Sequence, residues 1–400
     1  MISPKENSME SKKSNHIQFL HREDAKRPNE QKFTVTPWNV EGTIDYDRLI
    51  KDFGTEALTD SLLSRLEKHT GKLHYLLRRK IFFSHRDLNW LLDVHEKGET
   101  FYLYTGRGPS GHTTLGHMIP WMMTKWLQDV FGVDLWFQIT DDEKFLFKED
   151  LSLEETNKLG YENALDVIAM GFDPKKTRIF VDTDYAKTLY PQALRVAKHL
   201  NFSTTKAVFG FGGESNVGQI FFTSMQAVPC FLPSVLSGRK IPCLIPLAID
   251  QDPHFRVARD IMPKLGYHKP AVLHCRFLPS LSGGGKMSAS EPTETVFTTD
   301  TAEEVSRKIK RYAFSGGRDT VEEHRKKGGN PEIDTSYKWL TFFEEDDEKL
   351  RRIHEDYKTG HLLSGELKQI LIDKLNEILK KHQAEREKAK KKLDKFIVKD

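Results

Sequence analysis

The chain has 400 residues, of which 38% are hydrophobic and 30% charged, and its formal net charge is +3 at pH 7. These values are typical of a globular protein with two or three domains, and they give no overall positive charge for binding nucleic acid, so such a partner must be held by local patches. The chain has no run of the roughly 18 apolar residues needed to cross a bilayer, which excludes the membrane-spanning class. We therefore expect no membrane partner and a cytoplasmic location.

The N-terminal quarter of the chain is predicted to contain two parts. Residues 1–32 are polar and carry both signs of charge, so we expect a disordered tail without the apolar core of a secretory signal. Residues 33–99 form a predicted N-terminal extension, with a hairpin expected at 33–42 and a helix that Gly54 ends.

Apolar strands and helical segments alternate over residues 100–298. Strands are predicted at 101–105, 134–140, 177–184, 241–250 and 271–277. Helices are predicted between them, near 116–132, 156–171, 186–200 and 217–227. This alternation predicts an α/β fold, a Rossmann-like parallel-sheet domain that binds ligands beyond the carboxyl ends of its strands.

Residues 299–400 are expected to contain helices only. Six residues at helical spacing form one apolar face: Leu367, Ile370, Leu371, Leu375, Ile378 and Leu379. We expect an all-helical C-terminal domain whose last helix is able to pack back on the preceding domain. The basic run KAKKKLDK at 388–395 is typical of a solvated helix face, with a phosphate contact as the alternative.

The three cysteines, Cys230, Cys243 and Cys275, are far apart in the sequence. Their spacing matches neither a disulfide framework nor the paired ligands of a zinc site. We therefore expect separate, packed thiols and no metal bound by protein side chains.

A glycine-rich stretch, YTGRGPSGHTTLGH at 104–117, joins the first strand of the sheet to its helix. Its glycines would let backbone N–H groups and the helix N-terminus approach a phosphate, and Arg107 adds a fixed positive charge. On geometry alone, a plain strand-to-helix turn is an equal alternative.

A second stretch, SGGGKMSAS at 282–290, has one lysine and two hydroxyl groups that suit a mobile loop closing over a triphosphate. The alternative is a Ser/Gly linker. A P-loop is excluded, because GxxxxGK[ST] would require glycine at 280 and serine or threonine at 287, where the chain has Ser280 and Met287.

Together, TLGH at 114–117 and KMSAS at 286–290 resemble the paired HIGH and KMSKS signatures of class I aminoacyl-tRNA synthetases. Further stretches, including MTKWLQDVFG, TDDEKFLFK, LIPLAIDQDPHFRVARD and AFSGGRDTVEEHR, resemble the tryptophanyl-tRNA synthetases of the eukaryotic cytosolic type, over roughly residues 33–400. The resemblance implies a ligase that converts L-tryptophan and ATP into tryptophanyl-adenylate and transfers the acyl group to tRNA(Trp). It also implies Mg²⁺ bound through the ATP phosphates, a helical anticodon-binding domain and a homodimer.

The resemblance also implies roles for individual residues. The expected catalytic residues are Thr114, His117, Lys286, Ser288 and Ser290. The expected ATP-binding residues are Arg107, Gly108, Gly116, His117, Asp250, Lys286, Met287 and Ser288. The expected tryptophan-binding residues are Tyr104, Gln138, Glu143, Lys144, Gln226 and Gln251. The expected anticodon-reading residues are Arg318 and Asp319, although Asp319 after two glycines also fits a plain helix N-cap.

Two features leave alternatives open. Tyrosyl-tRNA synthetases share the fold and signatures, but commonly carry an aspartate in a QALD-like helix where this chain reads QAVP at 226–229, which favours an indole over a phenol. Thr114 replaces the first histidine of HIGH, so that either a neutral donor is tolerated, or His112 folds back to substitute, or ATP binds poorly. The change at Thr114 also keeps open a non-catalytic tRNA- or ATP-binding paralogue. A small-molecule nucleotidyltransferase of the same superfamily would not explain the helical domain.

Overall fold

The computed structural model describes residues 34–35, 40–42, 44–289 and 291–400. All of them belong to one compact unit that begins at Lys32. The tail predicted at 1–32 lies outside the described residues.

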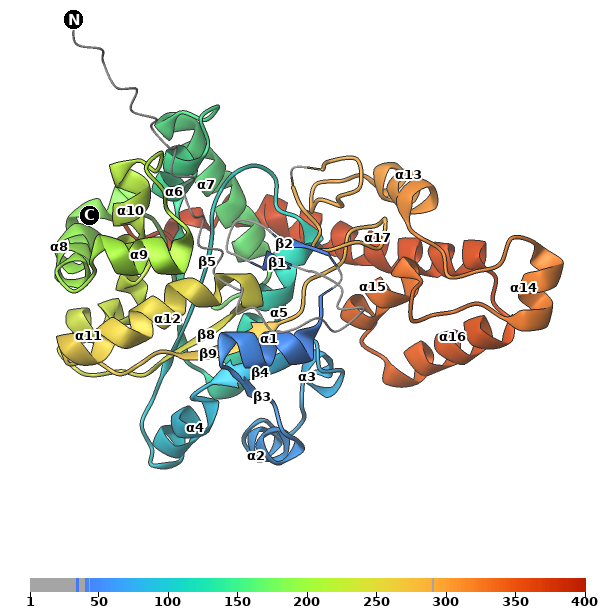
Figure 1. Cartoon of the computed structure of the whole chain (residues 1–400), viewed down its shortest axis with the longest axis horizontal. Helices are drawn as coiled ribbons and strands as arrows, with labels where there is room; N and C mark the ends of the chain where they lie inside the picture. The colour runs from blue at the N-terminus through green and yellow to red at the C-terminus, as the bar shows by residue number, and fades with distance from the viewer. Residues whose placement is uncertain (1–33, 36–39, 43, 290) are drawn as a thin grey trace, which may run out of the picture. The chain divides into compact units, whose positions relative to one another are not determined.

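A seven-stranded sheet forms the centre of this unit (Figure 1). Its strands, in spatial order, are β3 (Glu56–Ala57), β4 (Phe82–Arg86), β9 (Ala271–Cys275), β8 (Cys243–Ala248), β5 (Tyr102–Arg107), β6 (Asp134–Ile139) and β7 (Thr177–Val181). The five strands from β9 to β7 are parallel, whereas β4 pairs antiparallel with both β3 and β9. The α/β prediction is confirmed, and each strand predicted in residues 100–298 is present.

Helices connect the parallel strands and cover the sheet. They are α5 (Leu115–Phe131), α6 (Asp141–Phe147), α7 (Leu153–Ala169), α8 (Ala186–Ala197), α9 (Phe202–Phe209), α10 (Val217–Met225), α11 (Leu232–Ser237) and α12 (Asp252–Ile261). Short 3₁₀ helices occur at η1 (Thr183–Tyr185), η2 (Val228–Cys230), η3 (Ile249–Gln251), η4 (Met262–Leu265) and η5 (Leu393–Lys395). Because helices lie on both faces, the strands are buried on both sides and read as continuous apolar runs.

The N-terminal segment contributes to the same sheet, which the sequence did not indicate. It contains β1 (Thr34–Val35), β2 (Val40–Glu41), α1 (Tyr46–Phe53), α2 (Asp60–Thr70), α3 (Tyr75–Arg78) and α4 (Leu88–Glu96). The pairing of β1 with β2 matches the predicted hairpin, and α1 ends at Gly54, whose φ of 61° favours glycine. In contrast, β3 and β4 extend the sheet beside β9. A partner strand nearly 190 residues away leaves no local signal in the sequence.

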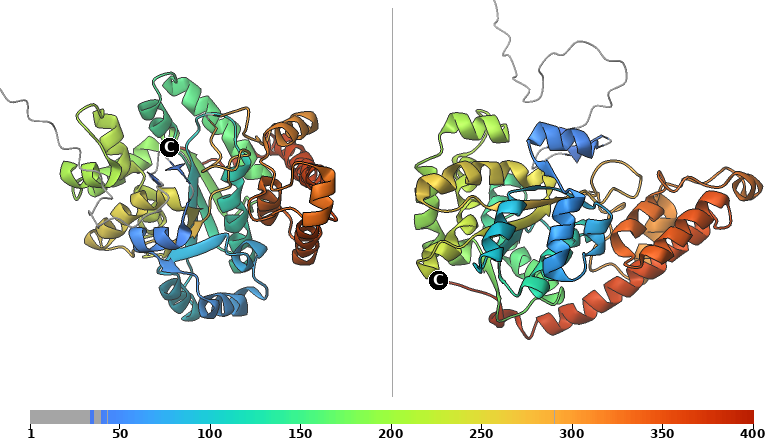
Figure 2. Two further views of the ribbon diagram at one scale, coloured as in Figure 1. Left: turned by 45° about the vertical axis from the view of Figure 1, so that its right-hand side comes forward. Right: turned by 90° about the horizontal axis from the view of Figure 1, so that it is seen from below.

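The C-terminal segment consists of α13 (Ala302–Tyr312), α14 (Val321–Lys327), α15 (Thr335–Phe343), α16 (Asp347–Thr359) and α17 (Ser364–Ala389). Leu367, Leu371 and Leu375 of α17 are fully buried, as its apolar face predicts. The long helix α17 packs against α13, α15 and α7 of the α/β part (Figure 2). Near its end, Nε2 of His382 lies 3.0 Å from Oδ1 of Asp166 in α7.

Two smaller predictions were also met. The three cysteines are buried and free. In the basic run, Lys388 and Lys390 are exposed and pair with Glu385 and Glu387 on the same helix, as a solvated face would. Among the described residues, no helix is long and apolar enough to cross a membrane.

Candidate active site

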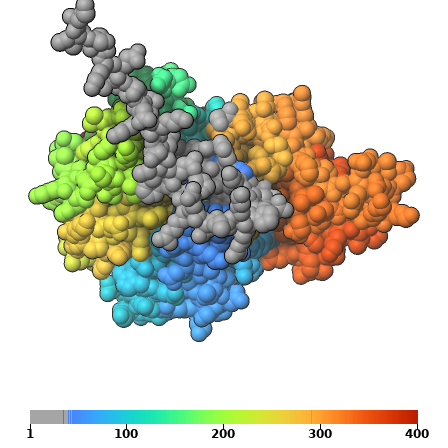
Figure 3. Space-filling view, in the orientation of Figure 1, coloured from blue at the N-terminus to red at the C-terminus, as the bar shows by residue number. Residues whose placement is uncertain are grey.

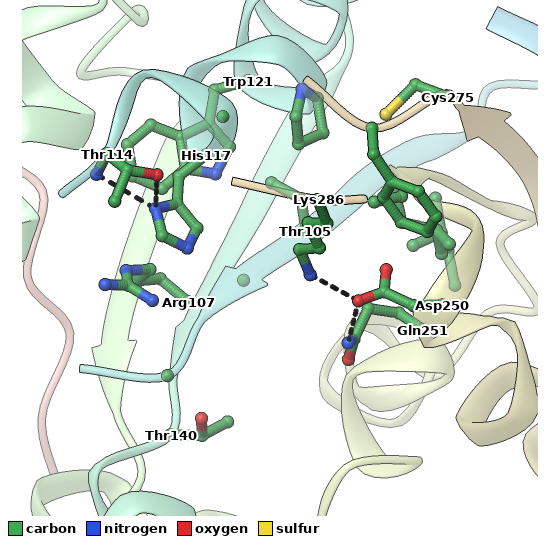
Figure 4. A pocket seen from close by; sticks show the side chains of 18 of the residues that line it. Thr105, Arg107, Thr114, His117, Trp121, Thr140, Asp250, Gln251, Cys275 and Lys286 are labelled. Atoms are coloured by element: carbon green, nitrogen blue, oxygen red, sulfur yellow. Dashed lines mark hydrogen bonds and ion pairs between the residues drawn. The ribbon is translucent and has the colours of Figure 1, made fainter. Parts of the chain in front are cut away.

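A cavity of about 250 Å³ opens at the carboxyl ends of β5, β8 and β9 (Figure 4). After β5 the chain passes through α5 to β6 on one side, while β8 lies on the other side of β5. The strand order therefore reverses at β5, and a crevice at such a reversal is where open α/β sheets bind their ligands. The sheet topology alone places a ligand site here.

Thr114 and His117 form a hydrogen-bonded pair at the start of α5 (Figure 4). The backbone N–H of Thr114 donates to Nδ1 of His117 at 3.1 Å, and Oγ1 of Thr114 lies 2.8 Å from the same nitrogen. Since Nδ1 accepts the N–H, the neutral imidazole carries its proton on Nε2. Burial, with the nearby charges of Arg107, Lys286 and Lys144, lowers the pKa of His117 well below its usual range. His117 is thus a neutral N–H donor at the cavity.

Arg107 and Gly108 at the end of β5 form the glycine-loop side of the cavity. Arg107 is buried, and its Nε has no hydrogen-bond partner among the described residues. Burial lowers the pKa of Arg107 to about 10, so the guanidinium remains charged at neutral pH. At Gly108, a Cβ atom would overlap Cε of Lys144, so a larger residue would displace the Lys144 side chain from the loop. Nη2 of Arg107 donates to the His112 carbonyl oxygen at 3.5 Å, so the free Nε–H is the donor that this buried cation can offer an anion beside the glycine loop.

Lys286 and Asp250 form an ion pair in the wall of the cavity (Figure 4). The Nζ atom of Lys286 lies 2.5 Å from Oδ2 of Asp250, and Nε2 of Gln251 donates to the same oxygen at 3.3 Å. The other oxygen, Oδ1, is buried and accepts no hydrogen bond from the described residues. It is therefore available to accept a hydrogen bond from a ligand hydroxyl.

Tyr104, Gln138 and Gln226 form a hydrogen-bond network at the inner end of the cavity. The Tyr104 hydroxyl donates to Oε1 of Gln138 at 2.6 Å and accepts from Nε2 of Gln226 at 2.6 Å. Burial raises the pKa of Tyr104 well above its usual range, so the phenol keeps its proton. The ring of Phe255 lies edge-on to that of Tyr104, 5.8 Å between centroids. This end thus combines an aromatic wall with neutral polar groups.

Glu143 and Lys144 at the start of α6 form a second ion pair in the cavity, with Oε1 of Glu143 2.7 Å from Nζ of Lys144. Burial by itself would raise the pKa of Glu143, but the Lys144 charge and hydrogen bonds from Lys144 and Thr140 lower it. Glu143 is therefore ionised and, with Lys144, offers both charges to a zwitterionic ligand.

The chain is similar to a family of known proteins and to individual members of that family. The model of the class I tRNA synthetases for tryptophan and tyrosine matches residues 96–380. A tryptophan–tRNA ligase of Sulfolobus acidocaldarius is 52% identical over 363 residues, covering 90% of this chain and 94% of the relative. The chain belongs to this synthetase family.

Solved structures agree with that assignment. The tryptophanyl-tRNA synthetase from Giardia lamblia is 42% identical, with a TM-score of 0.83, over 88% of this chain and 96% of that one. The tryptophanyl-tRNA synthetase from Encephalitozoon cuniculi, solved bound to tryptophan, is 39% identical, with a TM-score of 0.82. The match covers 89% of this chain and 98% of that one. The narrower prediction of a eukaryotic cytosolic type is not confirmed, because these comparisons do not single out that type.

The structure of this synthetase brings most of the predicted site residues to one cavity. Those that line it are Tyr104, Arg107, Gly108, Thr114, Gly116, His117, Glu143, Lys144, Gln226, Asp250, Gln251, Lys286 and Met287. Gln138 does not line the cavity but reaches it through Tyr104 and Gln226. Ser288 is exposed outside the lining, and Ser290 lies outside the described residues. Their roles remain predictions.

His112 is also placed by the structure. It is exposed and does not line the cavity, whereas Thr114 itself hydrogen-bonds His117. The alternative in which His112 folds back to substitute for the missing histidine is therefore absent from this structure.

Several lining residues were not predicted from the sequence. Arg276 and Phe277 directly follow β9, and Thr140 directly follows β6. The rule that ligands lie beyond the carboxyl ends of parallel strands would have pointed to them. Phe255, from α12, carries no such signal.

Arg318 and Asp319 lie away from the cavity, exposed before α14 in the C-terminal helical segment, whose atoms are orange in Figure 3. Thr320 is the N-cap, since its hydroxyl accepts from the Glu323 N–H at 3.1 Å, so the alternative of Asp319 as the helix cap is wrong. At Gly316, a Cβ atom would overlap the carbonyl oxygen of Asn330. Close packing of the backbone therefore requires glycine at this position. Reading of the anticodon by Arg318 and Asp319 remains a prediction.

Proposed function

We propose that this synthetase is a tryptophan–tRNA ligase, which activates L-tryptophan with ATP and passes the acyl group to tRNA(Trp). The observation that carries this choice is the network of Tyr104, Gln138 and Gln226 at the inner end of the cavity. These three residues are a phenol and two amides, so the network presents no carboxylate of its own to the cavity. Neutral acceptors of this kind suit the single N–H of an indole. The tryptophan–tRNA ligases and synthetases at 39–52% identity support it.

In the first step, a carboxylate oxygen of tryptophan attacks the α-phosphorus of ATP. A new P–O bond forms, the bond to the bridging oxygen breaks, and pyrophosphate leaves. No enzyme nucleophile is needed, so the protein contributes positioning and charge. We assign His117 Nε2–H, Arg107 and Lys286 to the phosphates, with Gly108 and Gly116 allowing close approach and Met287 packed beside them. Asp250 Oδ1 is assigned to the ribose, because it is buried and has no hydrogen-bond partner in the described part of the chain.

At the amino-acid end, Tyr104 with Gln138 is assigned to the indole. Glu143, Lys144, Gln226 and Gln251 are assigned to the ammonium and carboxylate groups of the substrate. The pairing of Glu143 with Lys144 supports this assignment, because each charge can exchange its partner for the opposite charge of the amino acid.

Mg²⁺ is expected to neutralise charge on the ATP phosphates in this reaction. The carboxylates that line the cavity, Glu143 and Asp250, are each paired with a lysine. They therefore fit a metal held through ATP better than one held by protein side chains. Lys286 and Arg107 would contribute further positive charge to the same phosphates.

Charging of tRNA completes the reaction, with the helical C-terminal segment assigned to anticodon binding through Arg318 and Asp319. We also propose a cytoplasmic homodimer. Exposed apolar side chains on neighbouring helices support dimer formation: Tyr190 and Leu194 on α8, Phe202 on α9 and Val217 on α10. Sedimentation of the Tyr190→Asp, Leu194→Asp double variant should show a monomer if this surface is the interface.

ATP–pyrophosphate exchange with L-tryptophan and L-tyrosine, assayed separately, tests the proposal. Exchange with tryptophan alone is expected. Exchange with tyrosine alone would establish the tyrosyl alternative, and exchange with neither would favour a non-catalytic paralogue. Acylation of tRNA(Trp) then separates a ligase from a small-molecule nucleotidyltransferase.

A further inference from the structure

A buried aspartate, Asp182, lies behind the proposed indole site. It follows β7, is 2% exposed and does not line the cavity. Both of its carboxyl oxygens accept from one nitrogen, Nε2 of Gln138, at 3.0 and 2.9 Å. Gln138 in turn accepts from the Tyr104 hydroxyl, so a chain of hydrogen bonds runs from Asp182 through Gln138 to Tyr104.

This chain determines which way the Gln138 amide points. The reverse orientation would place Oε1 against two carboxyl oxygens, which loses the hydrogen bonds and adds repulsion between acceptors. With Nε2 held by Asp182, Oε1 must face Tyr104 and Gln226. The Tyr104 proton is then committed to Oε1, and the phenol oxygen, which accepts from Nε2 of Gln226, can act only as an acceptor toward a further donor.

A second aspartate keeps Asp182 in place. Asp142 of α6 hydrogen-bonds Asp182, and burial together with the Asp142 charge raises the pKa of Asp182 well above its usual range. Burial also raises the pKa of Asp142 to about 7. The two carboxyl groups therefore share a proton near neutral pH. A proton donated from Asp182 to Asp142 leaves the remaining lone pairs of Asp182 free to accept from Gln138.

We propose that Asp182 is a positioning residue for tryptophan selectivity, because it fixes the Gln138 amide in the orientation that commits the Tyr104 proton to Gln138 and presents the Tyr104 oxygen as an acceptor to the substrate N–H. Asp182 does not touch the substrate. The inference rests on the proposed function, since it assumes that an indole occupies this end of the cavity.

The test compares L-tryptophan with 3-(3-benzothienyl)-L-alanine, in which sulfur replaces the N–H group. The ratio of kcat/KM for the two substrates is measured by pyrophosphate exchange. The wild type should prefer tryptophan by about 100-fold or more, because the analogue leaves buried acceptors unpaired. In Asp182→Ala, water replaces the carboxyl and can donate or accept, so the amide orientation is no longer fixed, and the ratio should fall at least about tenfold.

Two further variants separate positioning from general damage. Asp182→Asn keeps a carbonyl for Gln138 and an N–H for Asp142, so its ratio should stay within about threefold of the wild type. Asp184→Ala removes a nearby carboxylate that accepts from Asn157 and Tyr161, and should leave the ratio unchanged. If the alanine variant does not fold, Asp182→Ser takes its place, because its hydroxyl can also donate or accept.

The outcomes of these measurements are distinct. A ratio that falls in Asp182→Ala and is retained in Asp182→Asn supports the inference. An unchanged ratio in Asp182→Ala, with wild-type protein that responds to tryptophan, overturns the inference and leaves the proposed function intact. A wild type that does not respond to tryptophan overturns both.

Discussion

Lys286 and Asp250 form an ion pair of 2.5 Å between Nζ and Oδ2, which ties the KMSAS stretch to the segment after β8. Both residues are assigned to ATP, one to its phosphates and the other to its ribose. On these proposed roles, the lysine would exchange Asp250 for phosphate as the reaction proceeds. We expect the charge of Lys286 to contribute most when negative charge develops on the pyrophosphate leaving group.

Substitution of Lys286 should affect catalysis more than binding. In Lys286→Ala, the rate of tryptophanyl-adenylate formation should fall about 100-fold or more, with tryptophan affinity changed by less than about threefold. Single-turnover adenylation and equilibrium binding measure the two quantities. Lys264→Ala, at an exposed lysine, is the control. Equal losses in rate and affinity would contradict the assigned role.

Thr114 should act through its hydroxyl group. Thr114→Val removes the 2.8 Å contact with Nδ1 of His117, which loosens the imidazole and should lower the adenylation rate about tenfold. Thr114→Ser keeps the hydroxyl and should retain the rate to within about twofold. Full activity in the valine variant, or a loss in the serine variant as large as in the valine variant, would contradict a role carried by the hydroxyl alone.

Arg86 links the N-terminal strand β4 to α12. It donates to both carboxyl oxygens of Asp252, which is fully buried. Burial by itself would raise the pKa of Asp252. Hydrogen bonds from Arg86 and His274 outweigh burial and lower this pKa to about 2. Arg86→Met leaves a buried carboxylate without its main partner and should lower the free energy of unfolding by about 3 kcal/mol.

A surface pair provides the control for Arg86. Arg65 pairs with the exposed carboxylates of Asp93 and Glu96, so Arg65→Met should cost much less stability than Arg86→Met. Urea denaturation of both variants compares the costs. Similar losses of unfolding free energy in the two variants would mean that burial of the Arg86–Asp252 pair does not increase the cost of removing its arginine.

The stability of the protein should depend on pH through His254. Burial lowers the pKa of this histidine to about 4, against the usual 6.5. Above pH 6.5 the folded and unfolded chains are both neutral at this site. Between about 6.5 and 4 only the unfolded chain takes up the proton, so the free energy of unfolding falls as the pH falls.

His254→Phe removes this titration and keeps a ring against Phe209, whose centroid lies 4.8 Å away. When the pH is lowered from 7 to 5, the free energy of unfolding of the wild type should fall by about 1 to 2 kcal/mol more than that of the variant. Denaturation at both pH values measures it. A difference that does not change with pH would place the His254 pKa near its usual value.

Asp319 should matter for tRNA and not for adenylation. It is exposed and far along the chain from the cavity residues. Asp319→Ala should raise the KM for tRNA(Trp) at least about fivefold, since one base-edge contact is lost, and leave pyrophosphate exchange unchanged. Glu322→Ala, on the first turn of α14, is the control. Reduced exchange in Asp319→Ala would count against an anticodon role.

The sequence by itself determined the parallel strands, their helices and the family. These depend on local patterns: apolar runs bounded by turns, glycine at the ends of α1 and α5, and the motifs around His117 and Lys286. Each pattern is set by residues close together in the chain, because helix periodicity and capping are short-range properties.

Only the tertiary structure decided how distant side chains meet. The place of β4 beside β9, the Lys286–Asp250 pair and the hydrogen bonds from Asp182 to Gln138 all join residues far apart in the chain. The sequence shows that a carboxylate is present, but its partner, its protonation and the direction in which it turns an amide depend on burial and on the groups packed against it. For that reason the sequence predicted Gln138 as a site residue, whereas Asp182 behind it became visible only in the fold.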